Sequence, residues 1–173
     1  MNTSEDTTQI RYINIKNETI HEIGKFAIQW NIFEYLKCNY NSNCERIINM
    51  ENTFENLDKQ PFILLAQIFK KRASNLVCSI ENYVKNYIYP KENANINNND
   101  IEKHMPYVID FIESNGEINL AGALLAIYRI RNNMFHGLKG YGELDDQIEL
   151  FKAMNAVLKE VIIWVYITSL QAQ

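Results

Sequence analysis

Apolar side chains recur three or four positions apart in the first part of the chain, which is the spacing of one helical face. They predict a first long helix over about residues 16–38, with an inner face formed by Ile20, Ile23, Phe26, Ala27, Trp30, Phe33 and Leu36. The Asn- and Ser-rich segment that follows it favours a turn. Residues 44–57 then predict a short helix or an ordered loop.

The rest of the chain continues in the same way. Pro61 suits the first turn of a helix, and Pro90 cannot continue one. Asp100 is a candidate N-cap, and Asn115-Gly116 is a typical helix end. The helices predicted from these signals span about residues 61–89, 100–114, 118–136 and 144–170, with a polar loop before the second and a glycine-rich segment before the last.

These elements predict an all-α fold, an up-down helical bundle of four long helices plus one or more short helices. Residues 15–173 form a single domain in this interpretation, and residues 1–14, which lack a period, form a flexible N-terminal tail. The composition agrees, since 47% of the residues are hydrophobic and only 3 are proline and 6 glycine.

Charge and cysteine usage narrow the function classes. The net charge is −4, so a nucleic-acid site would have to be local rather than spread over a basic surface. The 3 cysteines form no C-x-x-C pair, which favours reduced thiols in a cytoplasmic protein over disulfides or zinc. The longest apolar run, residues 161–170, is too short to cross a bilayer. We expect no metal, no cofactor and no membrane contact.

The candidate chemistry lies late in the central helix. Helical geometry puts Arg131 in the middle of an apolar stripe, and puts Arg129, Asn132 and His136 together on the opposite face. An unpaired buried guanidinium is very costly. We therefore expect Arg131 to meet a carboxylate, to lie at the mouth of a cleft, or to sit where the helix ends or bends, between Asn132 and Gly137.

The segment "RNNMFHG", residues 131–137, resembles the signature of the HEPN superfamily: an arginine, four to six residues of which the first is often polar, and a histidine. The resemblance implies an all-helical homodimer in which two motifs face one shared cleft. It also implies a metal-independent endoribonuclease, as in toxins and phage-defence enzymes, with RNA as substrate and an antitoxin or another protein as a candidate partner. Leu138 stands where some toxins of this family carry a tyrosine.

Two arginines satisfy the spacing. Arg131 precedes His136 by four intervening residues, and Arg129 precedes it by six. Helical geometry favours Arg129 as the neighbour of the histidine, whereas the polar residue after the arginine favours Arg131. We assign Arg131 and His136 as catalytic, with Asn132, Arg129 and Lys139 in supporting roles.

The residue types suit RNA cleavage. Histidine titrates near neutrality and can act as acid or base, and arginine is a fixed bidentate cation for phosphate. A structural alternative remains open, in which Arg131 pairs with Glu34 and His136 is a surface residue near a helix C-terminus. A catalytically silent HEPN-like module that binds RNA, a nucleotide or a protein partner is the alternative function.

Overall fold

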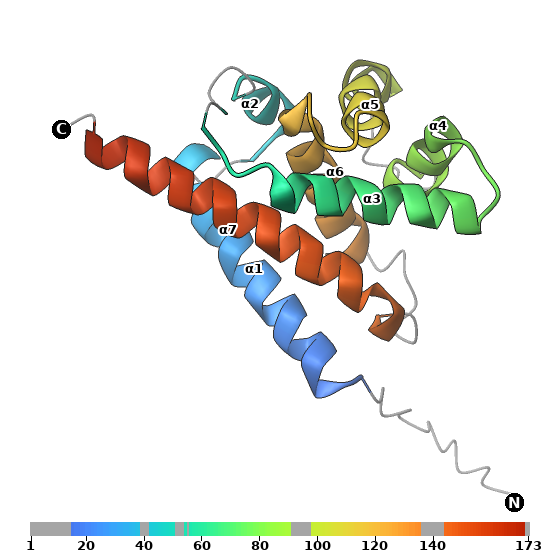
Figure 1. The fold of residues 1–173 in the computed structure, drawn as a ribbon, viewed down its shortest axis with the longest axis horizontal. Coiled ribbons are helices and arrows are strands. Elements are labelled where there is room, and N and C mark those ends of the chain that lie inside the picture. The colour runs from blue at the N-terminus through green and yellow to red at the C-terminus, as the bar shows by residue number, and fades with distance from the viewer. Residues whose placement is uncertain are drawn as a thin grey trace, which may run out of the picture.

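The computed structural model describes residues 15–38, 42–50, 54, 56–90, 98–135 and 144–171. These residues contain no strand, and the predicted all-α helical bundle is confirmed (Figure 1). The predicted tail, residues 1–14, lies outside them. The elements are α1 (Asn17–Cys38), α2 (Cys44–Ile48), α3 (Gln60–Asn75), α4 (Ile80–Tyr83), the π-helix η2 (Val84–Ile88), α5 (Asn98–Glu113), α6 (Leu120–Phe135), the 3-10 turn η4 (Asp145–Gln147) and α7 (Ile148–Gln171).

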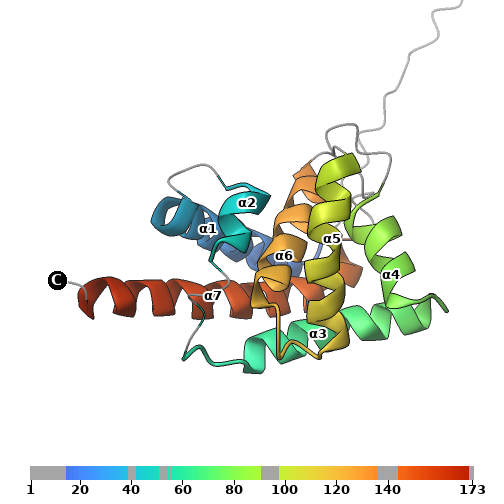
Figure 2. The ribbon, with the colours of Figure 1, turned by 90° about the horizontal axis from the view of Figure 1, so that it is seen from above.

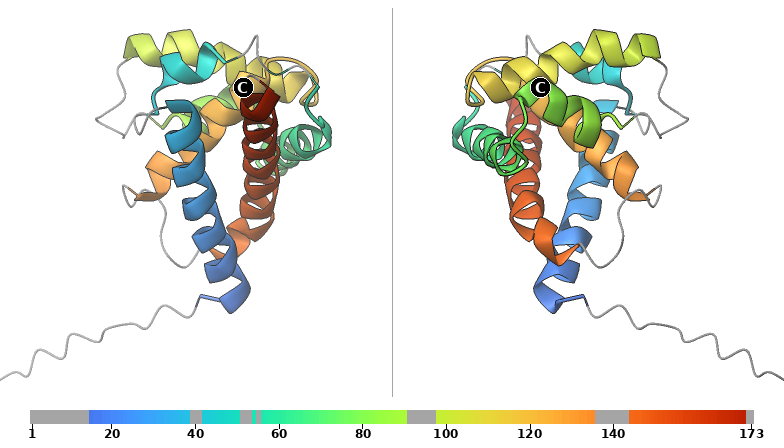
Figure 3. Two further views of the ribbon diagram at one scale, coloured as in Figure 1. Left: turned by 90° about the vertical axis from the view of Figure 1, so that its left-hand side faces the viewer. Right: turned by 90° about the vertical axis from the view of Figure 1, so that its right-hand side faces the viewer.

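The first and last helices are neighbours. α1 and α7 lie side by side and run in the same direction (Figure 1), and α3 packs along α7 on another side. Figure 2 shows α5 and α6 alongside each other, and in the side views of Figure 3 α2 and α5 lie at one end of the α1–α7 pair. α6 contacts α2, α3, α5 and η2, and its residues 121–127 are all buried. This central helix carries the candidate motif.

The predicted single helix over residues 61–89 is wrong, because the chain turns in its middle. α3 ends at Asn75, and Val77 adopts a φ of 52°, a conformation that β-branched residues rarely take. Ser79 then starts a new helix, since its side chain accepts a hydrogen bond from the backbone N–H of Asn82 at 3.2 Å. The new helix continues into η2, which ends before Pro90.

The end of α5 follows its sequence signal. Asn115 and Gly116 both have positive φ, 57° and 78°, and the Gly116 N–H donates to the Phe111 carbonyl at 2.8 Å. This is the closing bond of a Schellman-type helix end. The other end differs from the prediction: α5 begins at Asn98, so Asp100 lies inside the helix and is not its N-cap.

Candidate functional site

The second half of α6 carries the described part of the predicted site. Arg129, Arg131 and Asn132 all lie on this helix, which the structure describes as far as Phe135. His136 and Lys139 lie outside the described residues. The described residues therefore include both arginines and the residues on either side of segment 136–143.

Arg129 is a core residue. Only 7% of it is exposed, and its guanidinium carbon lies 5.0 Å from the ring centre of Tyr89 and 5.5 Å from that of Tyr128. One Nη donates to the Sγ of Cys44 at 3.6 Å, while Nε has no hydrogen-bond partner among the described residues. Our expectation that Arg129 lies opposite the buried stripe is wrong.

Arg131 is half-buried. The sequence predicted that it lies in the middle of the apolar stripe of this helix. Its Nη1 donates to the Oδ1 of Asn132 at 3.1 Å, and its guanidinium carbon lies 5.8 Å from the ring centre of Trp30 on α1. The carboxylate of Glu34, the partner considered from the sequence, accepts a hydrogen bond from the Ser42 hydroxyl. α6 is enclosed on several sides, so residues outside the predicted apolar stripe, such as Arg129, are buried as well.

Asn133 is a structural residue that the sequence did not reveal. It is 3% exposed, and its side-chain amide donates to the carbonyl of Ile88 at 3.1 Å. Ile88 ends the π-helix η2, where backbone carbonyls lack partners within the helix. The bond ties the motif helix to η2. No local signal separates Asn133 from its neighbour Asn132, which is half-buried.

The chain that follows the motif is anchored to α1. Asp145, at the start of η4, accepts hydrogen bonds from the backbone N–H of Lys16 at 3.1 Å and from the Thr19 hydroxyl at 2.5 Å. The bond from Thr19 is the main cause that holds the pKa of Asp145 below its ordinary value. The segment between α6 and α7 is thus held at both of its described ends.

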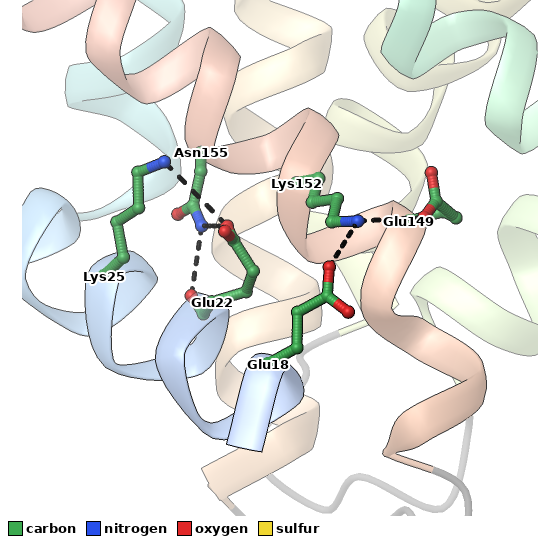
Figure 4. Close-up of polar contacts among 6 residues, drawn as sticks. All are labelled: Glu18, Glu22, Lys25, Glu149, Lys152 and Asn155. Carbon is green, nitrogen blue, oxygen red and sulfur yellow. Dashed lines mark hydrogen bonds and ion pairs between the residues drawn. The ribbon is translucent and has the colours of Figure 1, made fainter. Parts of the chain in front are cut away.

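A second set of polar contacts continues this anchor along α1 and α7 (Figure 4). Lys152 lies 2.8 Å from Glu18 and 3.3 Å from Glu149. The amide of Asn155 donates to the backbone carbonyl of Glu22 at 3.0 Å and to its carboxylate at 2.7 Å. The hydrogen bond from Lys152 lowers the pKa of Glu18, and the same contact raises the pKa of Lys152. Both directions show that these groups are charged together.

A cavity of about 590 Å³ lies between α3, η2 and the start of α7. Its Tyr83 and Tyr87 rings are stacked with centres 5.4 Å apart, and Arg72 donates to the side chain of Gln147 at 2.6 Å. Arg72 belongs to the basic run Lys70, Lys71 and Arg72. At least one charge of this run therefore makes a tertiary contact. The remaining lining is mixed: Ile68, Lys71, Asn75, Leu76, Ile88, Ile130, Asp146, Glu149 and Leu150.

Within the described ranges, no group of three or more His, Cys, Asp or Glu side chains is placed to hold a metal ion. The same residues include no helix with the length and apolarity needed to cross a membrane. The three cysteines are free thiols, with Cys38 and Cys44 buried and Cys78 half-buried.

Comparison of the chain with known protein families, with curated proteins and with solved structures found no match.

Proposed function

We propose that the protein is a metal-independent endoribonuclease of the HEPN type, with Arg131 and His136 as its catalytic residues. The observation that carries this proposal is the different placement of the two arginines. Arg129 is enclosed by two tyrosine rings, whereas Arg131 is partly open to solvent late in α6. A phosphate can reach a half-buried guanidinium, so burial favours Arg131 as the motif arginine.

The chemistry assigned to these residues is proton transfer and charge stabilisation. His136 would take the proton of a ribose 2′-hydroxyl or give one to the leaving oxygen, and this step requires RNA rather than DNA. Arg131 would stabilise the charge that develops on the phosphate. Its hydrogen bond to Asn132 restricts the orientation of the guanidinium, which gives Asn132 a positioning role.

The reaction needs an acid and a base, and one motif supplies one histidine. We therefore propose a homodimer whose two motifs share one site. α1 offers a surface for it, since Ile28, Ile32 and Tyr35 are exposed along one side of this helix. α1 also holds Trp30, over which Arg131 lies, so an interface on this helix keeps the site close to the partner copy.

The test is cleavage of a labelled RNA in EDTA by the wild type, His136→Ala, Arg131→Lys and Arg129→Lys. Loss of a general acid or base is expected to lower the rate by about 10² to 10⁴ in His136→Ala. Arg131→Lys keeps the charge but loses the bidentate fork, so it should also lose cleavage while its circular dichroism and melting temperature stay near wild type.

Arg129→Lys is the matched control. It should lower the melting temperature, because its ammonium cannot reproduce the stacked guanidinium, but leave the cleavage rate of the folded fraction unchanged. Loss of cleavage in Arg129→Lys but not in Arg131→Lys would assign the motif to Arg129. A wild type that cuts no RNA would refute the enzyme.

A catalytically silent module of the HEPN type, which binds RNA, a nucleotide or a protein partner, is the second candidate. The cavity beside Tyr87 favours it, because stacked rings next to polar side chains suit a planar ligand that forms hydrogen bonds. Calorimetric titration with mononucleotides and a short RNA tests this function. Binding that is lost in Tyr87→Ala, in a protein that cuts no RNA, would favour the module over the enzyme.

A further inference from the structure

A buried guanidinium lies at the contact between α2 and α6, and no carboxylate of the described residues pairs with it. Arg129 touches the faces of Tyr89 and Tyr128, and one Nη donates to the Sγ of Cys44 at 3.6 Å. Arginine stays charged in proteins. A buried charge is very costly unless an opposite charge compensates it, so the surroundings of Arg129 favour an anion.

Three ionisable side chains lie against this guanidinium: Tyr89, Tyr128 and Cys44. Burial raises the pKa of the Tyr89 hydroxyl far above its ordinary value, which excludes a phenolate at neutral pH. Tyr128 is also a phenol, and Cys44 is the one thiol among the three. A thiol ionises more easily than a phenol, and a neighbouring arginine favours the thiolate further.

We propose that Cys44 is held as a thiolate by Arg129 and is a site of covalent modification by peroxides and other soft electrophiles. This proposal is independent of the proposed ribonuclease activity. Cys44 is 8% exposed, and Arg129, itself more than nine-tenths buried and with an unpartnered Nε, points at its sulfur.

The other charges around α2 are engaged elsewhere. The carboxylate of Glu45 meets Lys103 and, at 3.7 Å, His104, both on α5. The guanidinium of Arg46 donates to the backbone carbonyl of Cys38. Arg129, by contrast, directs one Nη at the Cys44 sulfur.

The chain contains its own comparison thiols. Cys38 is buried too, at 0% exposed against 8% for Cys44, and burial together with the charge of Glu34 raises the pKa of Cys38 to about 11. Cys78 is half-buried, and its Sγ donates to the Ala73 carbonyl at 3.6 Å. If Arg129 determines thiol reactivity, Cys44 should react at a lower pH than either Cys38 or Cys78.

The modification is an ordinary two-electron oxidation. The Cys44 thiolate attacks one oxygen of hydrogen peroxide, an S–O bond forms, and the O–O bond breaks. The leaving hydroxide takes a proton, so peroxide is reduced to water while the sulfur becomes a sulfenic acid or its anion. Alkylation differs in its outcome, because a thioether is neutral and leaves Arg129 without a counter-charge.

The experiment measures alkylation of each cysteine by iodoacetamide as a function of pH, with peptide mapping by mass spectrometry. The pH midpoint at Cys44 is expected at least about one unit below the 8.5 of a free thiol, with Cys38 above it. In Arg129→Met the Cys44 midpoint should rise to that of a free thiol or higher. Equal midpoints for Cys44 and Cys38 would overturn the proposal. So would a Cys44 midpoint that is the same in Arg129→Met as in the wild type.

A second measurement covers the case in which Arg129→Met does not fold. The ultraviolet absorbance of a thiolate is compared between the wild type and Cys44→Ser at neutral pH. A difference of one thiolate per chain is the expected result. Equal absorbance in two folded proteins would show that Cys44 is protonated and would refute the thiolate.

Discussion

At Gly122 the backbones of two helices almost touch. A Cβ atom at this position of α6 would lie 2.1 Å from the carbonyl oxygen of Tyr107 and 2.8 Å from the Cβ of Phe111, both on α5. Backbone atoms cannot move aside as a flexible side chain can. α6 can therefore approach α5 this closely only because residue 122 is a glycine.

Gly122→Ala should consequently lower the free energy of unfolding by about 1 to 3 kcal/mol, because the two helices must separate. Gly24→Ala is the matched control, since nothing lies within 4 Å of a Cβ there. Removing a glycine from the interior of α1 should raise stability by about 0.5 to 1 kcal/mol. Urea unfolding followed by circular dichroism measures both, and equal stabilities would contradict the close packing of α5 and α6.

The adjacent asparagines of the motif offer a second comparison. Asn133→Ala removes the bond to the Ile88 carbonyl and leaves that buried group without this donor, which should cost about 1 to 3 kcal/mol. Asn132→Ala, at a half-buried position beside Arg131, should change stability by less than about 0.5 kcal/mol. Chemical denaturation of the two variants measures the difference. A larger loss in Asn132→Ala would mean that the roles are reversed.

These residues show where sequence reasoning stopped. The spacing of "RNNMFHG" pointed to the segment that carries the candidate chemistry, and its residues 131–135 lie on α6. The spacing could not rank Arg129 against Arg131, or Asn132 against Asn133, by burial. Periodicity identifies a buried face when a helix packs on one side, whereas α6 packs against α2, α3, α5 and η2.

At the scale of the elements, helices with their own local signals were predicted well. α1 and the end of α5 match the predicted ranges, because apolar spacing and the Asn115-Gly116 pair act locally, whereas α2 covers only the first five residues of the predicted range 44–57. The turn after α3 was missed. Its residues include no glycine or proline, and Val77 takes a positive φ there. Val77 is exposed, and the turn is closed by backbone bonds from the Val77 N–H to the Ser74 carbonyl and from the Cys78 N–H to the Ala73 carbonyl. Every residue type can form such bonds, so the residue pattern carries no signal for them.

The contact between α1 and α7 predicts the response to acid. The pKa values of Asp145 and Glu18 are lowered in the folded protein, so each carboxylate stabilises the fold above its unfolded pKa. That stabilisation is lost as the pH falls through the lowered folded pKa. The melting temperature should therefore drop between about pH 5 and pH 2.

The double variant Asp145→Asn, Glu18→Gln tests whether these two carboxylates cause the acid response. The double variant should melt lower than the wild type at neutral pH and should show a shallower drop in acid. Calorimetric scans along the pH series compare the two proteins. Parallel curves would mean that other carboxylates cause the acid response.

For the whole molecule, the proposed homodimer makes a prediction about α1. Ile32→Glu places a charge in the exposed apolar stripe and should convert a dimer into a monomer, with loss of RNA cleavage. Ile163→Glu, at an exposed position of α7, is the control and should leave the dimer intact. Light scattering at micromolar concentration measures the mass. A monomeric wild type that still cuts RNA would refute the shared site.

The pairing of α1 with α7 also determines when the core can be completed. Phe26 of α1 packs edge-on against Phe151 of α7, with ring centres 5.8 Å apart, and Thr19 meets Asp145 across 126 residues of chain. During synthesis from the N-terminus, α1 leaves the ribosome long before its partner exists. Until α7 emerges, the part of the inner face of α1 that holds Phe26 and Thr19 lacks the partners that cover it in the folded protein.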